Sequence, residues 1–142
     1  GGSGAFGLVT VRTALGAPAR IVGVQAERAD AFARAWRTGD RTPGAQADTF
    51  AEGLATRVTF DMTFAALKRG LDDVVTLTER ELEDGVRMAL RTTHNLAEGA
   101  GAAALAAAFK MRQELEGKSV VCVMSGGNLD SRTLAKILGG RT

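Results

Sequence analysis

Features that mark secreted or membrane-bound proteins are missing from this sequence. It has a single cysteine, Cys122, which excludes a disulfide within the chain and favours a reducing compartment, the cytoplasm. No run of about 18 or more apolar residues occurs, so no membrane-spanning helix is expected. No signal-peptide pattern is recognisable either. The sequence therefore predicts a protein without a membrane partner.

The charged and aromatic residues do not form a pattern that would bind nucleic acid. The net charge is only +2, and aromatic residues make up 5% of the chain. The arginines between positions 20 and 41 alternate with acidic and apolar residues, without an aromatic-interleaved basic stripe. No nucleic-acid partner is expected. With 142 residues, of which 45% are hydrophobic, the chain is long enough for one domain with a core.

Short β-branched stretches alternate with longer helical ones along the chain. Two predicted helix starts carry capping signals: Thr78 with Glu81 in a capping box, and Asp130 as an N-cap. Strands alternating with helices predict an α/β fold with an open, mainly parallel sheet and helices on both faces. The predicted strands are 20–25, 74–77 and 119–124, and the predicted helices are 8–15, 29–38, 60–69, 78–91, 101–114 and a last one from 131.

The chain opens on a glycine-rich stretch, GGSGAFG, which we interpret as a phosphate-binding loop before the helix at 8–15. Its spacing, Gly2-x-Gly4-x-x-Gly7, matches the dinucleotide-binding fingerprint, and Glu27 follows the next predicted strand as a ribose-binding acid would. A tight turn before a helix explains the glycines equally well. The stretch has no strand in front of it and no initiator Met, so we expect residue 1 to be an interior position of a longer protein.

Two later stretches could also carry chemistry. In VVCVMSGGNLD, an apolar strand runs into a Ser-Gly-Gly-Asn loop, which would present Ser125 at the carboxyl end of a parallel sheet, where ligands bind. An ordinary strand-to-helix turn has the same composition. In LAEGAGAAALAA, Glu98 precedes a helix of small residues, and a solvated acid before a tightly packed helix is the simpler interpretation.

Taken in order, the stretches GSGAFG, FAEGLATR, HNLAEGAGAAALAA and VMSGGNLD resemble the C-terminal half of the serine/threonine dehydratases. These are pyridoxal-phosphate lyases that share their fold with the β chain of tryptophan synthase. The resemblance covers essentially the whole chain. It implies that residues 1–142 form the C-terminal part of the large domain that binds pyridoxal 5'-phosphate, and that the opening glycines hold the phosphate of this cofactor.

The resemblance also assigns cofactor contacts to individual residues. The backbone N–H groups of the glycine-rich loop surround the phosphate; this loop is Gly1, Gly2, Ser3, Gly4 and Ala5. Gly53 lies beside the cofactor ring, and the Glu98 carboxylate lies near the far edge of the ring. The Ser125 hydroxyl forms a hydrogen bond with the pyridine nitrogen. Ser3 and Ala5 depart from the commoner all-glycine loop, and Glu52 stands where the family more often has Asp.

The implied reaction is the α,β-elimination of water from L-threonine or L-serine, which gives a 2-oxo acid and ammonia. A serine hydroxyl, unlike an aspartate, does not keep the pyridine nitrogen protonated, which suits rapid loss of a β-hydroxyl group. A serine racemase or another hydroxy-amino-acid dehydratase is the neighbouring alternative. A non-catalytic ligand-binding or interaction fragment, and a dinucleotide-binding module, are alternatives from other classes.

The resemblance places the Schiff-base lysine in an N-terminal half that precedes residue 1. The lysines present, Lys68, Lys110, Lys118 and Lys136, do not match its motif. We therefore expect no catalytic residue in this chain, activity only together with the N-terminal half, an amino acid as substrate, and a homo-oligomer. The metal requirement stays undetermined, because Ala33 stands where metal-binding relatives have an acid.

Overall fold

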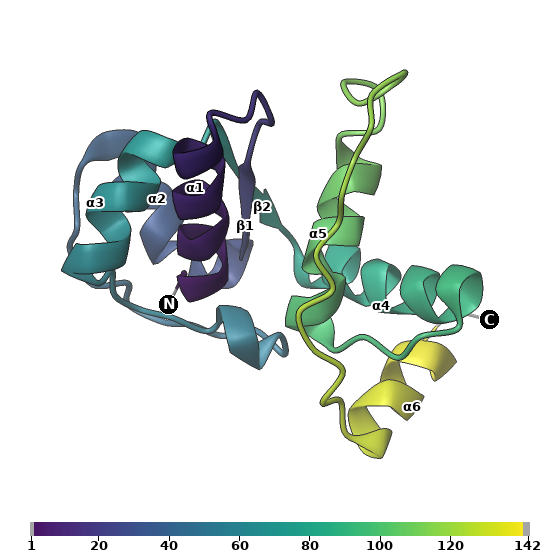
Figure 1. Ribbon diagram of the computed structural model, residues 1–142. Coiled ribbons are helices and arrows are strands. Elements are labelled where there is room, and N and C mark those ends of the chain that lie inside the picture. The colour runs from purple at the N-terminus through teal and green to yellow at the C-terminus, as the bar shows by residue number, and fades with distance from the viewer. Residues whose placement is uncertain (1, 141–142) are drawn as a thin grey trace.

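The structure, a computed structural model, describes residues 2–140 and is an α/β fold around a small parallel sheet (Figure 1). Strands β1 (Val22–Ala26) and β2 (Asp73–Leu77) pair in parallel, with Val22 opposite Asp73. The helices are α1 (Ser3–Leu15), α2 (Ala31–Thr38), α3 (Asp61–Gly70), α4 (Glu79–Thr93), α5 (Gly99–Lys110) and α6 (Ser131–Gly139), with short 3-10 helices η1 (Glu27–Ala29) and η2 (Glu52–Leu54). The predicted α/β class with parallel pairing is confirmed. None of the described helices is long and apolar enough to span a membrane.

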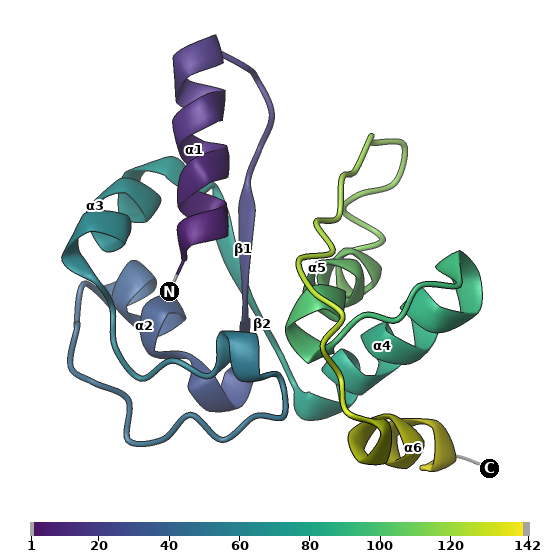
Figure 2. The same ribbon diagram turned by 60° about the horizontal axis from the view of Figure 1, so that its bottom comes forward.

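Helices cover both faces of the sheet, with α1, α2 and α3 on one side and α4 and α5 on the other (Figures 1 and 2). Successive residues of β2 point to opposite faces, as in any strand. Val74 packs with Val9 of α1 and Leu67 of α3. Leu77 packs on the other face, in a cluster with Leu82 of α4 and with alanines of α5. The small alanine side chains bring α5 close to the sheet.

Both predicted capping signals form. The Thr78 hydroxyl accepts a hydrogen bond from the Glu81 N–H at 3.2 Å, and the Glu81 carboxylate accepts one from the Thr78 N–H at 2.8 Å, which completes the capping box of α4. The Asp130 carboxylate accepts from the N–H groups of Arg132 and Thr133 and caps α6. Local sequence therefore fixes where these two helices begin.

Two helices differ from their predicted bounds by several residues. The first helix begins at Ser3 instead of Leu8, so most of the glycine-rich stretch is the opening of α1. Among the described residues of that stretch, only Gly2, with φ at +85°, has a left-handed backbone. Helix propensity alone could not show this, because glycine is a poor helix former. Helix α5 covers Gly99–Lys110 instead of 101–114. Residues 111–117 form turns, because mostly exposed side chains there offer no continuous apolar face to pack.

The predicted strand at 119–124 does not form among the described residues. The segment is extended and runs beside α5 (Figure 1). Cys122 Sγ lies 3.6 Å from the carbonyl oxygen of Ala104, and burial raises the pKa of this thiol. Val121 is 90% exposed. A strand needs a ladder partner for its backbone N–H and C=O groups, and the described residues place none beside this segment.

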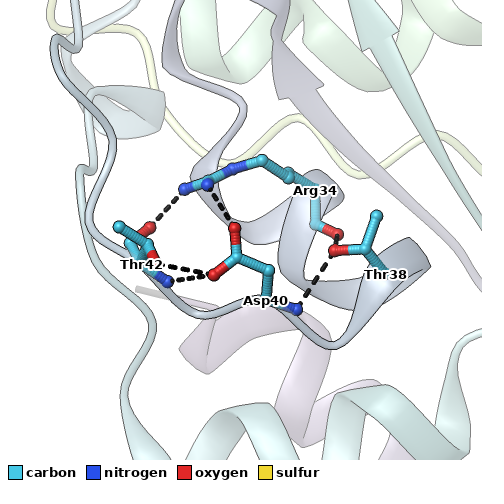
Figure 3. Close-up of polar contacts among 4 residues, drawn as sticks. All are labelled: Arg34, Thr38, Asp40 and Thr42. Atoms are coloured by element: carbon cyan, nitrogen blue, oxygen red, sulfur yellow. Dashed lines mark hydrogen bonds and ion pairs between the residues drawn. The ribbon is translucent and has the colours of Figure 1, made fainter.

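A network around Asp40 fixes the start of the long connection between α2 and α3 (Figure 3). Its carboxylate accepts hydrogen bonds from the N–H and hydroxyl groups of Thr42 and pairs with Arg34 at 2.8 Å. The hydrogen bonds from Thr42 come first among the causes that lower the pKa of Asp40. Arg34 also donates to the Thr42 carbonyl oxygen, while the Asp40 N–H donates to the Thr38 hydroxyl. The chain then continues past the sheet towards α5 (Figure 2).

Asp72 joins the start of the sheet to α1 and makes stability depend on pH. The Ile21 N–H donates to its carboxylate at 2.8 Å and lowers its pKa, as does Arg12 at 2.7 Å. Because the folded-state pKa lies below the unfolded value of about 3.9, ionised Asp72 stabilises the fold above that pH. This contribution is lost as the pH falls through the folded-state pKa.

We expect Asp72→Asn to lower the free energy of unfolding by about 1 kcal/mol at pH 7. The difference between the variant and the wild type should shrink as the pH falls below about 4, because the wild-type carboxyl group is then neutral too. Urea unfolding of the full-length protein at a series of pH values measures it. A difference that does not change with pH would contradict this role of Asp72.

Candidate functional site

The N-terminus of α1 is built to receive an anion. The first backbone N–H groups of a helix have no partner within the helix and point outward, towards the positive end of its dipole. Gly2 is the N-cap residue without a side-chain cap, and no acidic residue stands in the first turn. A Cβ atom built on Gly4 would meet no atom within 4 Å. Open space over uncapped N–H groups is the arrangement that binds phosphate at helix N-termini.

Gly53 lies in η2, which rests directly against the start of α5. A Cβ atom at position 53 would lie 2.8 Å from the Cβ of Ala100, a distance that real side chains do not adopt. The close approach therefore requires a glycine in η2 and a small residue in α5. Gly53 lines the same cavity as the first residues of α1.

The loop that carries Ser125 is held against the N-terminus of α5 by backbone contacts. The Glu98 N–H donates to the carbonyl oxygen of Gly126 at 3.1 Å. A Cβ atom on Gly101 would overlap that same carbonyl group, and a Cβ on Gly127 would lie 2.6 Å from the carbonyl oxygen of Leu96. Only glycines permit this fit. The Ser125 side chain itself stays exposed.

Six of the eight predicted site residues line one cavity of about 890 Å³. They come from three segments far apart in the sequence, which the fold brings together: Gly2, Ser3, Gly4, Ala5, Gly53 and Ser125. Glu98 instead lines a neighbouring cavity of about 400 Å³ together with Glu52 and Asp130, and its side chain stands next to Gly126. Gly1 lies outside the described residues. The contact assigned to Glu98 stays a prediction.

Much of the cavity wall is apolar and was not predicted as part of a site. Leu8, Val11 and Leu15 follow one another along one side of α1, and each is exposed. Residues 22–25 of β1 and the side chains of Val121 and Val123 complete this wall. The spacing of the α1 residues was visible in the sequence, but it indicates a buried face of a helix as readily as the wall of a site.

No lysine among the described residues lines the cavity. Lys68 donates to the carbonyl oxygen of Trp36 and lies over its ring, and Lys110 pairs with Glu81 at 3.0 Å. Lys118 and Lys136 are also absent from the lining. Within residues 2–140, no group of three or more His, Cys, Asp or Glu side chains is placed to hold a metal ion.

These features define a class of protein: an α/β domain that binds an anionic small molecule beside the edge of a parallel sheet. A family model described as pyridoxal-phosphate dependent enzyme matches residues 1–126. The L-threonine ammonia-lyase of Thermotoga maritima is 31% identical over 97% of this chain and 34% of its own length. The chain belongs to this family of pyridoxal-phosphate-dependent enzymes.

Solved structures agree with this assignment. The processed form of threonine deaminase isoform 2 from Solanum lycopersicum superposes with a TM-score of 0.86 and 25% identity, over 94% of this chain and 38% of that one. Maize serine racemase superposes with a TM-score of 0.83 and 25% identity, over 95% and 44%. The chain thus has the fold of these enzymes, and it spans between about a third and a half of the length of the relatives that it matches.

The residues present fit pyridoxal 5'-phosphate, the cofactor of this family. The open space over Gly4 at the start of α1 has room for a phosphate, and the cavity extends from there to Gly53 and Ser125. A hydroxyl can donate to an unprotonated ring nitrogen. The family thereby favours this cofactor over the dinucleotide that the glycine spacing alone had left open.

Proposed function

We propose that this chain is the C-terminal part of the large domain of an enzyme that eliminates water from L-threonine or L-serine and yields a 2-oxo acid and ammonia. The convergence of Gly2–Ala5, Gly53 and Ser125 on one cavity, in a chain of this family, carries the proposal. The relatives support the chemistry, since they include an L-threonine ammonia-lyase and a threonine deaminase.

Each part of the cavity has one task in this proposal. The N–H groups at the start of α1 hold the phosphate and anchor the cofactor. The backbone of Gly53 bounds the ring, and the Ser125 hydroxyl donates a hydrogen bond to its nitrogen without adding charge. When bound, pyridoxal 5'-phosphate withdraws electrons from Cα, the substrate carbon adjacent to the one that carries the leaving hydroxyl group. In this proposal the apolar wall is the surface that the rest of the protein covers.

The N-terminal half of the protein completes the site in this proposal. The cavity lies between the edge of β1 and the extended segment that carries Val121, Val123 and Ser125, alternate residues that face it. Among the described residues β1 pairs only with β2, so its other edge can pair with a further strand supplied by the N-terminal half. That half also supplies the lysine that this cavity lacks. The exposed apolar side chains of α1 become buried in the same step.

Three alternative functions have weaker support than the elimination of water. Racemisation of serine is favoured by one observation, the similarity to maize serine racemase. A non-catalytic fragment and a dinucleotide-binding module have less support, since neither needs a serine at the end of the segment 119–124. A cytoplasmic location and a homo-oligomer remain part of the proposal, the first on the strength of a single half-buried cysteine.

The absorption spectrum of the purified full-length protein tests the proposal. We expect a yellow protein whose band disappears when the cofactor is removed and returns on titration with pyridoxal 5'-phosphate. NAD added at the same concentrations should not bind. A full-length protein that stays colourless with added pyridoxal 5'-phosphate would contradict the proposed activity, although the fold and the family would still stand.

Gly4→Val tests the phosphate end of the cavity. Gly4 does not have a left-handed backbone, so valine is tolerated in the fold, but its side chain enters the open space over the first turn of α1. We expect the affinity for pyridoxal 5'-phosphate to fall about tenfold or more, measured by titration of the cofactor-free protein. Gly7→Val is the matched control, because Gly7 stands one turn further along α1 and outside the cavity lining. If Gly4→Val bound pyridoxal 5'-phosphate as tightly as the wild type and Gly7→Val do, the start of α1 would not hold the phosphate.

A further inference from the structure

We propose that Glu79 is a positioning residue that sets the place of the Gly53 backbone, and that it thereby controls the affinity for the cofactor without touching it. This inference rests on the function proposed above. Glu79 is the first residue of α4 and follows the carboxyl end of β2, on the side of the sheet where ligands of parallel sheets bind. It lines neither cavity.

The Glu79 carboxylate ties α4 to the segment that leads into η2. Its Oε2 atom accepts a hydrogen bond from the Thr49 hydroxyl at 3.1 Å and one from the Phe50 N–H at 3.0 Å. The Thr49 hydroxyl in turn accepts from the Ala51 N–H at 3.2 Å. One carboxylate oxygen therefore fixes three successive residues, directly or through one hydroxyl group.

These three residues determine where Gly53 lies. Ala51 is buried and opens the 3-10 turn, since the Leu54 N–H donates to its carbonyl oxygen at 2.8 Å. The ring of Phe50 lies against Gly99, where an added Cβ would be 2.7 Å away. Rotation of the segment about residues 49–51 would move Gly53 off Ala100 and change the depth of the cavity beside it. The hydrogen bonds of Glu79 oppose that rotation.

The carboxylate is not needed to begin the helix. Thr78 and Glu81 complete the capping box of α4 by themselves. The second oxygen of Glu79, Oε1, is buried and has no hydrogen-bond partner among the described residues. A buried carboxylate oxygen without a partner costs free energy. The geometry that Glu79 imposes on residues 49–51 accounts for its presence better than a gain in stability does.

The test compares variants of the full-length holoenzyme. We expect Glu79→Ala to weaken the affinity for pyridoxal 5'-phosphate about tenfold, because the hydrogen bonds that the Phe50 N–H and the Thr49 hydroxyl donate to the carboxylate are lost. Thr49→Val, which removes only the hydroxyl relay, should weaken it less. Hydrogen exchange of the amides in residues 50–54 should become faster in both variants. Glu83→Ala is the matched control, because it removes from the same helix a carboxylate that pairs with Arg87 at 3.1 Å.

The outcomes separate this inference from the proposed function. If the wild-type protein binds no pyridoxal 5'-phosphate, the function falls and this inference falls with it. If the wild type binds it and both Glu79→Ala and Thr49→Val bind it equally well, only the role of Glu79 falls. A lower melting temperature with unchanged affinity and unchanged exchange at 50–54 would likewise reduce Glu79 to a structural residue. Loss of affinity in Glu79→Ala and in Thr49→Val, but not in Glu83→Ala, supports the positioning role of Glu79.

Discussion

Gly101→Val is expected to lower the free energy of unfolding by about 3 kcal/mol and to displace the loop that carries Ser125. The valine Cβ would overlap the carbonyl group of Gly126, which is backbone and cannot rotate away as a flexible side chain could. The same carbonyl oxygen accepts the hydrogen bond from the Glu98 N–H, so the displacement also breaks that bond. Overpacking of this kind costs about 1–3 kcal/mol, and a lost buried hydrogen bond adds about 1 kcal/mol. Urea unfolding of the full-length protein measures the loss.

Gly7→Ala is the matched control for this prediction. Both residues are glycines within helices, but an added Cβ on Gly7 meets no atom within 4 Å. Alanine there should stabilise the protein by about 0.5–1 kcal/mol, because it restricts the unfolded chain and favours the helix. If Gly101→Val proved as stable as the wild type, the contact between α5 and the Ser125 loop would not be the one described above.

Helix ends with a cap written into the sequence could be predicted to the residue. The capping box of Thr78 and Glu81 and the N-cap Asp130 depend on side chains within three residues of the helix start. Such signals do not depend on what packs around them. Gly39 directly follows α2 with φ at +82°, the left-handed backbone that glycine commonly adopts after the last residue of a helix.

Structure that depends on partners elsewhere could not be predicted in the same way. The β-branched stretch 119–124 has the composition of a strand, but composition cannot supply the neighbouring strand whose groups it must pair with. The glycines before Leu8 were expected to form a loop, because glycine has a low helix propensity and the sequence alone does not show what packs around them. Gly4 and Gly7 instead lie in α1 and Gly2 is its N-cap residue, where small residues leave room for an anion.

The residues of the candidate site also differ in whether the sequence could reveal them. Gly2–Ala5, Gly53 and Ser125 were found through a family resemblance carried by short motifs, and the fold brings these segments to one cavity. Glu79 has no motif around it that sets it apart from the other acids of α4. Its contact with Thr49 joins residues 30 positions apart, and such a contact becomes visible only when the fold is known. Charged residues on helices are usually solvated, so sequence reasoning passes over it.

Ser125→Asp is expected to reduce turnover of L-threonine in the full-length enzyme by about 100-fold while the protein stays folded. The side chain at 125 is exposed at the cavity wall, so a carboxylate there overlaps nothing and costs little stability. It does change the charge at the place where the proposal puts the ring nitrogen. An aspartate would hold a proton on that nitrogen, whereas the serine hydroxyl only donates a hydrogen bond to it. A fixed charge in a site closed to water alters reaction barriers by several kcal/mol.

The measurement separates this electrostatic effect from a loss of binding. Release of 2-oxo acid gives kcat, and titration of the cofactor-free protein gives the affinity for pyridoxal 5'-phosphate. We expect kcat to fall while the affinity changes by less than about tenfold, since the phosphate end of the cavity is untouched. Ser125→Thr, which keeps the hydroxyl group, should retain most of the turnover. Equal turnover in Ser125→Asp and in the wild type would contradict the contact between Ser125 and the ring nitrogen. It would not contradict the cavity or the proposed phosphate site at the start of α1.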